Sequence, residues 1–158
     1  MKKTKVKSVS CILLVLFLML SVSLDVHARE DVKQIDGSYL MDKDESIGYA
    51  TPITRGDDLV VGYSKCVRLA NGNLYVGGST LAAHPVERIG IAVIVERAKE
   101  EDTEWETYDS WIVHEENEEW LSSTKELNVE GGYYYRVRCI HSAGNDMSSS
   151  FTDGLFFE

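Results

Sequence analysis

The chain has 158 residues, 16 of them basic and 26 acidic, so its formal net charge is -10 at pH 7. This length fits one domain, and 12 glycines and 3 cysteines are too few for a collagen-like chain or a disulfide-dense scaffold. The acidic balance argues against nucleic acid and against anionic membrane surfaces as partners.

The first 28 residues have the three parts of a secretory signal peptide. Four lysines precede an apolar run from Cys11 to Leu20, and Val26-His27-Ala28 has the form of a cleavage site. The apolar run is shorter than the roughly 20 residues that a bilayer span needs. We therefore predict cleavage between Ala28 and Arg29 and a secreted, extracellular protein with no membrane attachment after processing. Removing this segment leaves 12 basic and 25 acidic residues, a net charge of -13.

Residues 29–58 form a polar, acidic stretch without a sustained apolar period. Such a composition buries too little apolar surface to offset the entropy lost on ordering. We predict a flexible acidic leader here. The alternative is a short docking strand that contains Ile47, Tyr49 and Ile53.

Residues 59–158 consist of short runs in which apolar and polar residues alternate, as in strands with one buried face. The expected strands cover 59–69, 74–80, 89–95, 105–113, 121–129, 133–140 and 152–157. Asn71-Gly72 favours a type I′ hairpin turn, whereas the charged residues 96–102 and the polar residues 142–149 are expected in loops or a hairpin tip. Seven strands and no convincing helix predict an all-β fold, a two-layer antiparallel β-sandwich of the immunoglobulin/fibronectin III-like type.

Side-chain parity assigns the faces of two of these strands. Tyr135, Val137 and Cys139 share the core side of strand 133–140, whereas Arg136 and Arg138 share the other side. In strand 59–69 an odd-numbered set is assigned to the core, so the even-numbered Cys66 is expected to face away from it. The set is Leu59, Val61, Tyr63, Val67 and Leu69.

The two cysteines that remain after processing, Cys66 and Cys139, favour a disulfide because an exported chain with an even count is typically bridged. Since Cys66 does not have core parity, this pairing needs a bulge near Lys65 or a strand covered on both faces. The alternative is two buried free thiols.

Two resemblances add to this reading. The run GYYYRVRCIHSAGNDMSSSFTDGLFF resembles the last two strands of fibronectin type III modules, which implies a tyrosine corner at Tyr135. The order TRG, NGNLYVGGST, ERIGIAVIVER and GYYYRVR with a following His is similar to a family of small secreted proteins of unknown function from Gram-positive, clostridia-type bacteria. That resemblance implies a secreted bacterial all-β domain and assigns no functional residues.

Aromatic residues are the candidate binding groups. Exposed rings on a sheet face stack on sugars or anchor a partner protein. The alternative is that Trp105 and Trp111 fill the core. The candidate ligand-facing aromatics are Trp105, Tyr108, Trp111, Trp120 and Tyr134.

Motifs of catalysis and metal binding are missing from the sequence. His84, His114 and His141 are too widely spaced for a typical metal site and are expected at surface or edge positions. We interpret the acidic turn at residues 115–119 as solvated surface rather than as catalytic carboxylates. The integrin-type tripeptide Arg55-Gly56-Asp57 is interpreted as a chance occurrence. We therefore predict no catalytic residue, cofactor or metal, and a non-enzymatic module that binds a glycan or an extracellular protein. The alternative is a small secreted hydrolase or inhibitor.

Overall fold

The computed structural model describes residues 32–50 and 56–158. They belong to one unit, Val32–Glu158. The predicted signal peptide, its cleavage site at Ala28 and Arg29, and residues 51–55 with Ile53 and Arg55 lie outside the described residues. In the described ranges the chain forms eleven strands. None of its described segments is a helix that is long and apolar enough to cross a membrane.

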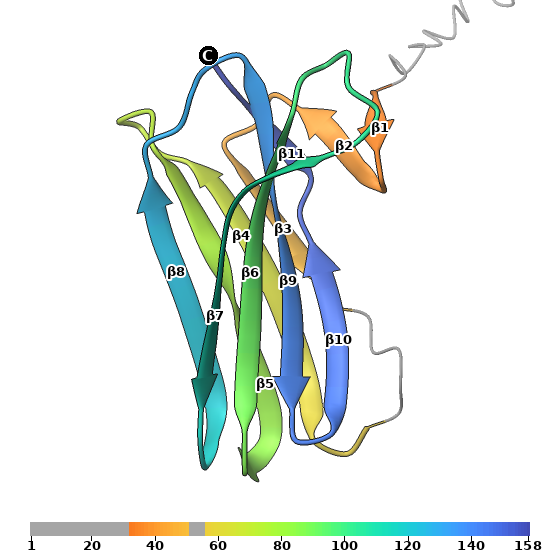
Figure 1. Ribbon diagram of the computed structural model, residues 1–158, viewed down its shortest axis with the longest axis vertical. Helices are drawn as coiled ribbons and strands as arrows, with labels where there is room; N and C mark the ends of the chain where they lie inside the picture. The colour runs from red at the N-terminus through yellow and green to blue at the C-terminus, as the bar shows by residue number, and fades with distance from the viewer. Residues whose placement is uncertain (1–31, 51–55) are drawn as a thin grey trace, which may run out of the picture. The chain divides into compact units, whose positions relative to one another are not determined.

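The strands form two sheets that pack face to face (Figure 1). The larger sheet has the order β1-β2-β11-β9-β6-β7, with β10 also paired to β9, and the smaller has the order β3-β4-β5-β8. All pairs are antiparallel except β2 with β11. The predicted two-layer β-sandwich is therefore confirmed. The strand bounds are β1 Gln34–Ile35, β2 Ser38–Met41, β3 Glu45–Tyr49, β4 Leu59–Arg68, β5 Leu74–Val86, β6 Ile89–Ala98, β7 Glu106–Glu115, β8 Glu118–Leu127, β9 Tyr133–Ala143, β10 Asp146–Phe151 and β11 Gly154–Phe157.

The core lies between the sheets and follows the alternation of the long strands. Ile89, Ile91, Val93 and Val95 of β6 are all buried. On β9 the buried set Tyr135, Val137 and Cys139 is as predicted. The Tyr135 hydroxyl donates a hydrogen bond of 3.0 Å to the carbonyl of Glu130, which confirms the tyrosine corner.

The face assignment of β4 was wrong. Gly62, Ser64 and Cys66 face the core, and the odd-numbered residues form the outer side. The pairing of β4 with β5 shifts at a bulge between Leu59 and Val61, and such an extra residue exchanges the two faces. Gly62 also leaves the space that the His141 ring fills.

The turn at Asn71-Gly72 also differs from the type I′ prediction. Only Gly72 has a positive φ, 83°, and its N–H donates to the carbonyl of Leu69. Leu69 and Asn73 close a three-residue loop, the hairpin type in which one left-handed residue follows a type I turn.

The expected flexible leader is corrected within the described range, because residues 34–49 supply β1, β2 and β3. Asp36 and Gly37, with φ values of 45° and 81°, make the two-residue turn between β1 and β2. Ile35 and Leu40 are buried there against Ala98 in a second, smaller core. β3 contains Ile47 and Tyr49, as the alternative of a docking strand proposed.

Two segments expected as loops are partly strands, whereas residues 99–102 lie between β6 and β7 as expected. β6 continues to Ala98, so Glu96 lies within the sheet and is 4% exposed. β9 continues to Ala143, and β10 follows after a two-residue turn at Gly144-Asn145. The buried positions of β10 are the serines 148 and 150, so hydrophobic alternation could not reveal it. The region 59–158 therefore holds eight strands, β4 to β11, where seven were predicted.

Candidate functional site

The outer side of strands β7, β6, β9 and β10 forms a surface that we call the open face. The register aligns its side chains in three rows across the four strands. The rows are His114–Gly90–Ser142–Met147, Ile112–Ala92–Ile140–Ser149 and Ser110–Ile94–Arg138–Phe151.

The largest hydrophobic side chains of the open face are accessible to solvent. Ile112 is 65% exposed, Met147 61%, Phe151 45% and Ile140 38%. Gly90 and Ala92 on β6 carry little or no side chain, so the sheet surface at these two positions projects less than at the larger neighbours. None of its twelve residues is acidic, in a chain with 26 acidic residues. This surface therefore lacks the acidic side chains that are abundant in the rest of the sequence, and Arg138 is its one Lys or Arg residue.

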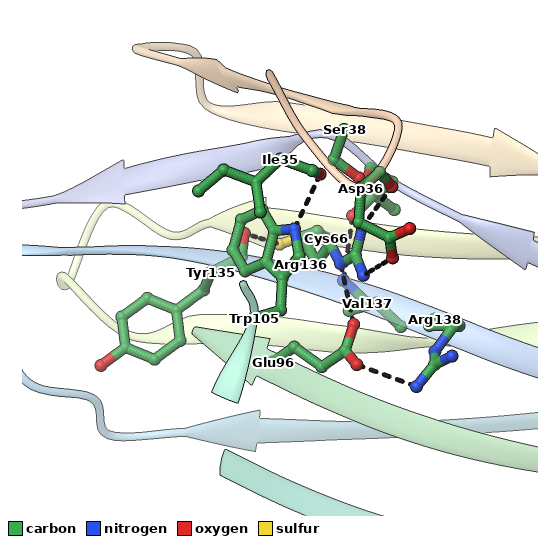
Figure 2. A network of polar contacts seen from close by, with 11 residues as sticks. Ile35, Asp36, Ser38, Cys66, Glu96, Trp105, Tyr135, Arg136, Val137 and Arg138 are labelled. Atoms are coloured by element: carbon green, nitrogen blue, oxygen red, sulfur yellow. Dashed lines mark hydrogen bonds and ion pairs between the residues drawn. The ribbon is translucent and has the colours of Figure 1, made fainter. Parts of the chain in front are cut away.

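Next to the open face, the β1–β2 hairpin joins the sheet through the pairing of β2 with β11, and its turn covers Arg136 on the outer side of β9. Arg136, two residues before Arg138 on β9, lies beneath this hairpin and is 2% exposed. Its Nη2 donates to the Asp36 carboxylate at 2.8 Å, and its Nη1 donates to Ser38 Oγ at 2.9 Å and to the Asp36 carbonyl at 3.0 Å (Figure 2). The hairpin is thus fixed to the sheet by charge-assisted hydrogen bonds.

Glu96 of β6 joins the covered part of the sheet to the open face. Its Oε2 accepts from Arg136 Nε at 2.8 Å, and its Oε1 accepts from Arg138 Nη2 at 2.9 Å (Figure 2). The Glu96 side chain is 6% exposed, so both ion pairs are shielded from water on the carboxylate side. The Arg138 side chain is 43% exposed, and its buried Nε has no hydrogen-bond partner among residues 32–50 and 56–158.

The hydrogen bond from Arg136 is the main cause that lowers the pKa of Asp36 below its ordinary value. The positive charges of Arg136 and Arg138 act in the same direction, against the desolvation of the carboxylate. Asp36 is therefore ionised at neutral pH, and the hairpin docks as an anion on a cationic site.

Two of the predicted aromatic residues belong to the second core rather than to a ligand surface. Trp105 stacks on Arg136, whose Cζ lies 4.6 Å from the ring centroid, and its indole N–H donates to the carbonyl of Ile35. Tyr134 packs against the same core, with its ring centroid 5.0 Å from that of Phe156. Both side chains help to hold the hairpin.

The other three aromatics lie elsewhere. Tyr108 meets Tyr135 edge-on, and Trp111 packs on the main core with its N–H bonded to Ser123 Oγ. Trp120 is 58% exposed on β8, at the edge of the smaller sheet. The structure therefore does not bring the five residues together on one surface.

The smaller sheet also carries aromatic residues on its outer side. Tyr49 and Tyr63 lie on paired strands with ring centroids 6.3 Å apart, but their planes are tilted by 52°. Tyr63 also accepts a hydrogen bond from Ser79. Tilted rings present no common plane to a sugar, so this side is a weaker candidate for stacking on a glycan.

The predicted disulfide is absent, and both cysteines are free and buried. Cys66 Sγ lies 3.5 Å from the carbonyl of Tyr135, whereas Cys139 is four residues further along β9. Four residues of a strand span about 13 Å, and a disulfide needs Cα atoms within about 7 Å. The two thiols therefore occupy different levels of the core, and burial raises the pKa of the Cys139 thiol to about 12.

The histidines were expected at surface or edge positions, and His141 is an exception because it is fully buried. Thr80 Oγ1 donates to the carbonyl of Gly90 and lies 2.9 Å from His141 Nδ1, and Ser150 Oγ lies 2.8 Å from Nε2. Since Thr80 has one hydroxyl proton, Nδ1 must donate to it and Nε2 must accept from Ser150. Burial lowers the pKa of His141 to about 4.

This Ser150–His141 pair has the contact of a nucleophile and its base, but Ser150 is 1% exposed and no substrate can reach it. His84 makes an exposed contact of 3.3 Å with Asp58, and His114 belongs to the open face. Among the residues described, no group of three or more His, Cys, Asp or Glu side chains could hold a metal ion.

A hollow of about 650 Å³ at one end of the sandwich is lined by Asp42, Asp44, Arg68 and Glu158. Arg68 is the only basic residue among those that line it, and its guanidinium already binds Asp42, Asp44 and the carbonyl of Phe156. This hollow therefore offers no free cationic group to a ligand. Comparison of the chain with protein-family models, with curated proteins and with solved structures finds no match.

Sequence reasoning placed Arg136 and Arg138 on the same side of one strand, and the structure agrees. It missed the open face as a site, because the face is assembled from side chains of four strands. The signal that could have found it is the apolar second face of β6, at Ala92 and Ile94.

Proposed function

We propose that this protein is a secreted, non-enzymatic binding module that docks an apolar segment of another extracellular protein on the open face. The observation that carries the proposal is the exposure of Ile112, Ile140, Met147 and Phe151 on one side of a sheet without any acidic neighbour in the face. The signal-peptide pattern of residues 1–28 supports secretion.

The size of the face favours a single segment over a whole domain. Four strands about 4.8 Å apart and five residues of about 3.3 Å each give a footprint of roughly 300 Å². That is the size of a functional apolar patch, but less than half of the roughly 800 Å² per partner in a standard protein interface. A second copy of the protein is a less favourable occupant of the open face, because two processed chains with a net charge of -13 each repel one another.

The chemistry of the face favours a peptide over a glycan. Its large exposed hydrophobic side chains are aliphatic apart from Phe151, and sugars are bound mainly by aromatic rings. The chain's own hairpin supports a peptide occupant, because it lies on the adjoining part of the same sheet with Ile35 and Leu40 buried.

Selection of random peptides displayed on phage, panned on the mature protein, tests this function. We expect enriched peptides whose binding falls at least about tenfold on an Ile140→Asp variant, because the variant removes an apolar contact and puts a charged group in its place. An Ile47→Asp variant is the matched control, since Ile47 is 43% exposed on the outer side of the other sheet. Peptides that bind both variants equally, or no enriched peptides, would contradict the proposal.

Secretion is tested separately. The protein recovered from culture supernatant should begin at Arg29 on N-terminal sequencing. Intact protein that begins at Met1 and stays with the membrane fraction would contradict secretion.

A further inference from the structure

We infer that Arg138 is a carboxylate-binding site within the open face, so that the docked segment carries an Asp or Glu residue between apolar side chains. The inference rests on the proposed function, and it adds the chemistry of the partner. It also makes Arg138 the residue that decides which apolar segments are accepted.

The contact between Arg136 and the hairpin shows how this sheet face binds a segment. The carboxylate and the carbonyl of Asp36 both accept hydrogen bonds from Arg136, and the apolar residues Ile35 and Leu40 are buried nearby. A turn in which an acid directly follows a buried apolar residue therefore already fits a guanidinium on this side of β9.

Arg138 repeats this position two residues further along β9. Both arginines point to the same side of the sheet, and both are held by the same carboxylate of Glu96. Arg136 has its second carboxylate from Asp36, whereas Arg138 has only Glu96 among its ion pairs in the described residues. The two arginines and the carboxylates of Asp36 and Glu96 balance in charge, but Arg138 donates to Glu96 through Nη2 alone. Its side chain is 43% exposed, so the outer side of the guanidinium can donate to a second carboxylate.

The neighbours of Arg138 suit the apolar residues of the same segment. Ile94 is its register partner on β6, and Phe151 is its partner on β10. Ile140 is the next residue of β9 on the open face and is 38% exposed. A segment that covers these side chains removes water from the Arg138 head group, which strengthens its attraction to a carboxylate.

Glu96 also prepares the site before the partner arrives. Its hydrogen bond to Nη2 fixes one side of the Arg138 guanidinium, and β6 and β9 hold both residues in paired positions. A guanidinium that is already oriented loses less side-chain entropy on binding than a free one.

The sequences of the phage-selected peptides provide the first test. Peptides that depend on Ile140 should be enriched in Asp or Glu next to aliphatic or aromatic residues. One such peptide is then synthesised, together with a version in which Asn or Gln replaces the acid. On the wild-type protein the amide version should bind at least about tenfold more weakly.

A double-mutant cycle assigns this loss to Arg138. On Arg138→Ala and Arg138→Gln variants, the acidic and amide peptides should bind within about twofold of each other, because the partner of the carboxylate is gone. The control is Lys43→Ala, which removes an exposed charge from the β2–β3 connection and should keep the tenfold preference. Thermal unfolding of each variant checks that it is folded.

Two failures can be told apart. If peptides bind the open face without enrichment of acids, or prefer the acid equally on the Arg138 variants, the inference is wrong and the docking function stands. If no peptide depends on Ile140, the docking function fails and the inference fails with it.

Discussion

Glu96 is the residue on which two buried or partly buried arginines depend. It is a carboxylate in the interior of a sheet, and both its oxygens accept hydrogen bonds from guanidinium groups. Removing one partner of a buried ion pair typically costs about 3 to 5 kcal/mol, because the remaining charge is left without compensation.

We therefore expect Glu96→Gln to lower the free energy of unfolding by about 3 kcal/mol. The change keeps the shape of the side chain and removes its charge. Urea unfolding followed by tryptophan fluorescence measures it, with Glu104→Gln as the exposed control. A Glu96→Gln midpoint equal to that of the control would show that the pair does not stabilise the fold.

His141 makes stability depend on pH. It is neutral in the folded protein, where its pKa is about 4 instead of the ordinary 6.5, so the unfolded chain binds a proton more readily. The free energy of unfolding is therefore unaffected by this histidine above pH 6.5, and it decreases as the pH falls from 6.5 towards 4. The shift corresponds to about 3 kcal/mol in all.

His141→Gln should remove this pH dependence. Between pH 6 and 5, the free energy of unfolding of the wild type should fall about 1 kcal/mol more than that of the variant. His84→Gln, at an exposed histidine, is the control and should keep the wild-type slope. Equal slopes for the wild type and His141→Gln would refute the neutral buried histidine.

At the scale of elements, the β1–β2 hairpin is a tight turn with one position that requires glycine. Gly37 has a φ of 81°, and a side chain there would also approach the Phe151 ring to 3.3 Å. A left-handed conformation costs an L-residue about 1 to 2 kcal/mol.

Gly37→Ala should therefore destabilise the protein by about 1 kcal/mol, and its effect should concentrate in the hairpin. Hydrogen exchange should speed up at the amides of residues 38–41 and stay unchanged in β6. Ser149→Ala, at an exposed position on β10, is the control and should have neither effect. Unchanged exchange in the hairpin would contradict the assigned turn.

The sequence predicted the elements whose alternation is long and hydrophobic. β6 and β9 each have buried hydrophobic residues at three or more alternate positions, so the two-residue period in the sequence matches the burial in the structure. β1 and β2 have two and four residues, too few to show a period, although Asp36-Gly37 carried the turn signal. β10 was missed because its inward residues are serines.

The site was harder to predict than the strands. Parity alone placed Arg136 and Arg138 on the outer side of β9. From the sequence, Glu96 was expected in a charged loop. The register of β6 with β9 instead places it opposite Arg136. Asp36 is 100 residues from Arg136, and no local pattern reveals such a contact.

At the scale of the whole molecule, the state of the thiols follows from the packing of the two sheets. Cys66 and Cys139 are both fully buried. Cys66 of β4 lies beside Tyr135 of β9, four residues before Cys139 on that strand. Burial raises the pKa of each thiol, so neither is a reactive thiolate at neutral pH.

The mature protein should therefore show no reactive thiol when folded and two when unfolded in urea. Labelling with a thiol reagent, followed by mass spectrometry without any reductant, measures both numbers. A Cys66→Ser variant is the control and should show one label after unfolding. The absence of labels in the unfolded wild type would mean that the two cysteines are bridged after all.

Methyl NMR of the mature protein, titrated with a selected acidic peptide, tests docking on the open face most directly. The signals of Ile112, Ile140 and Met147 should shift together and saturate at one affinity, whereas that of Ile47 on the opposite sheet should stay in place. Shifts confined to Ile47 and the outer side of the smaller sheet would contradict the docking proposal.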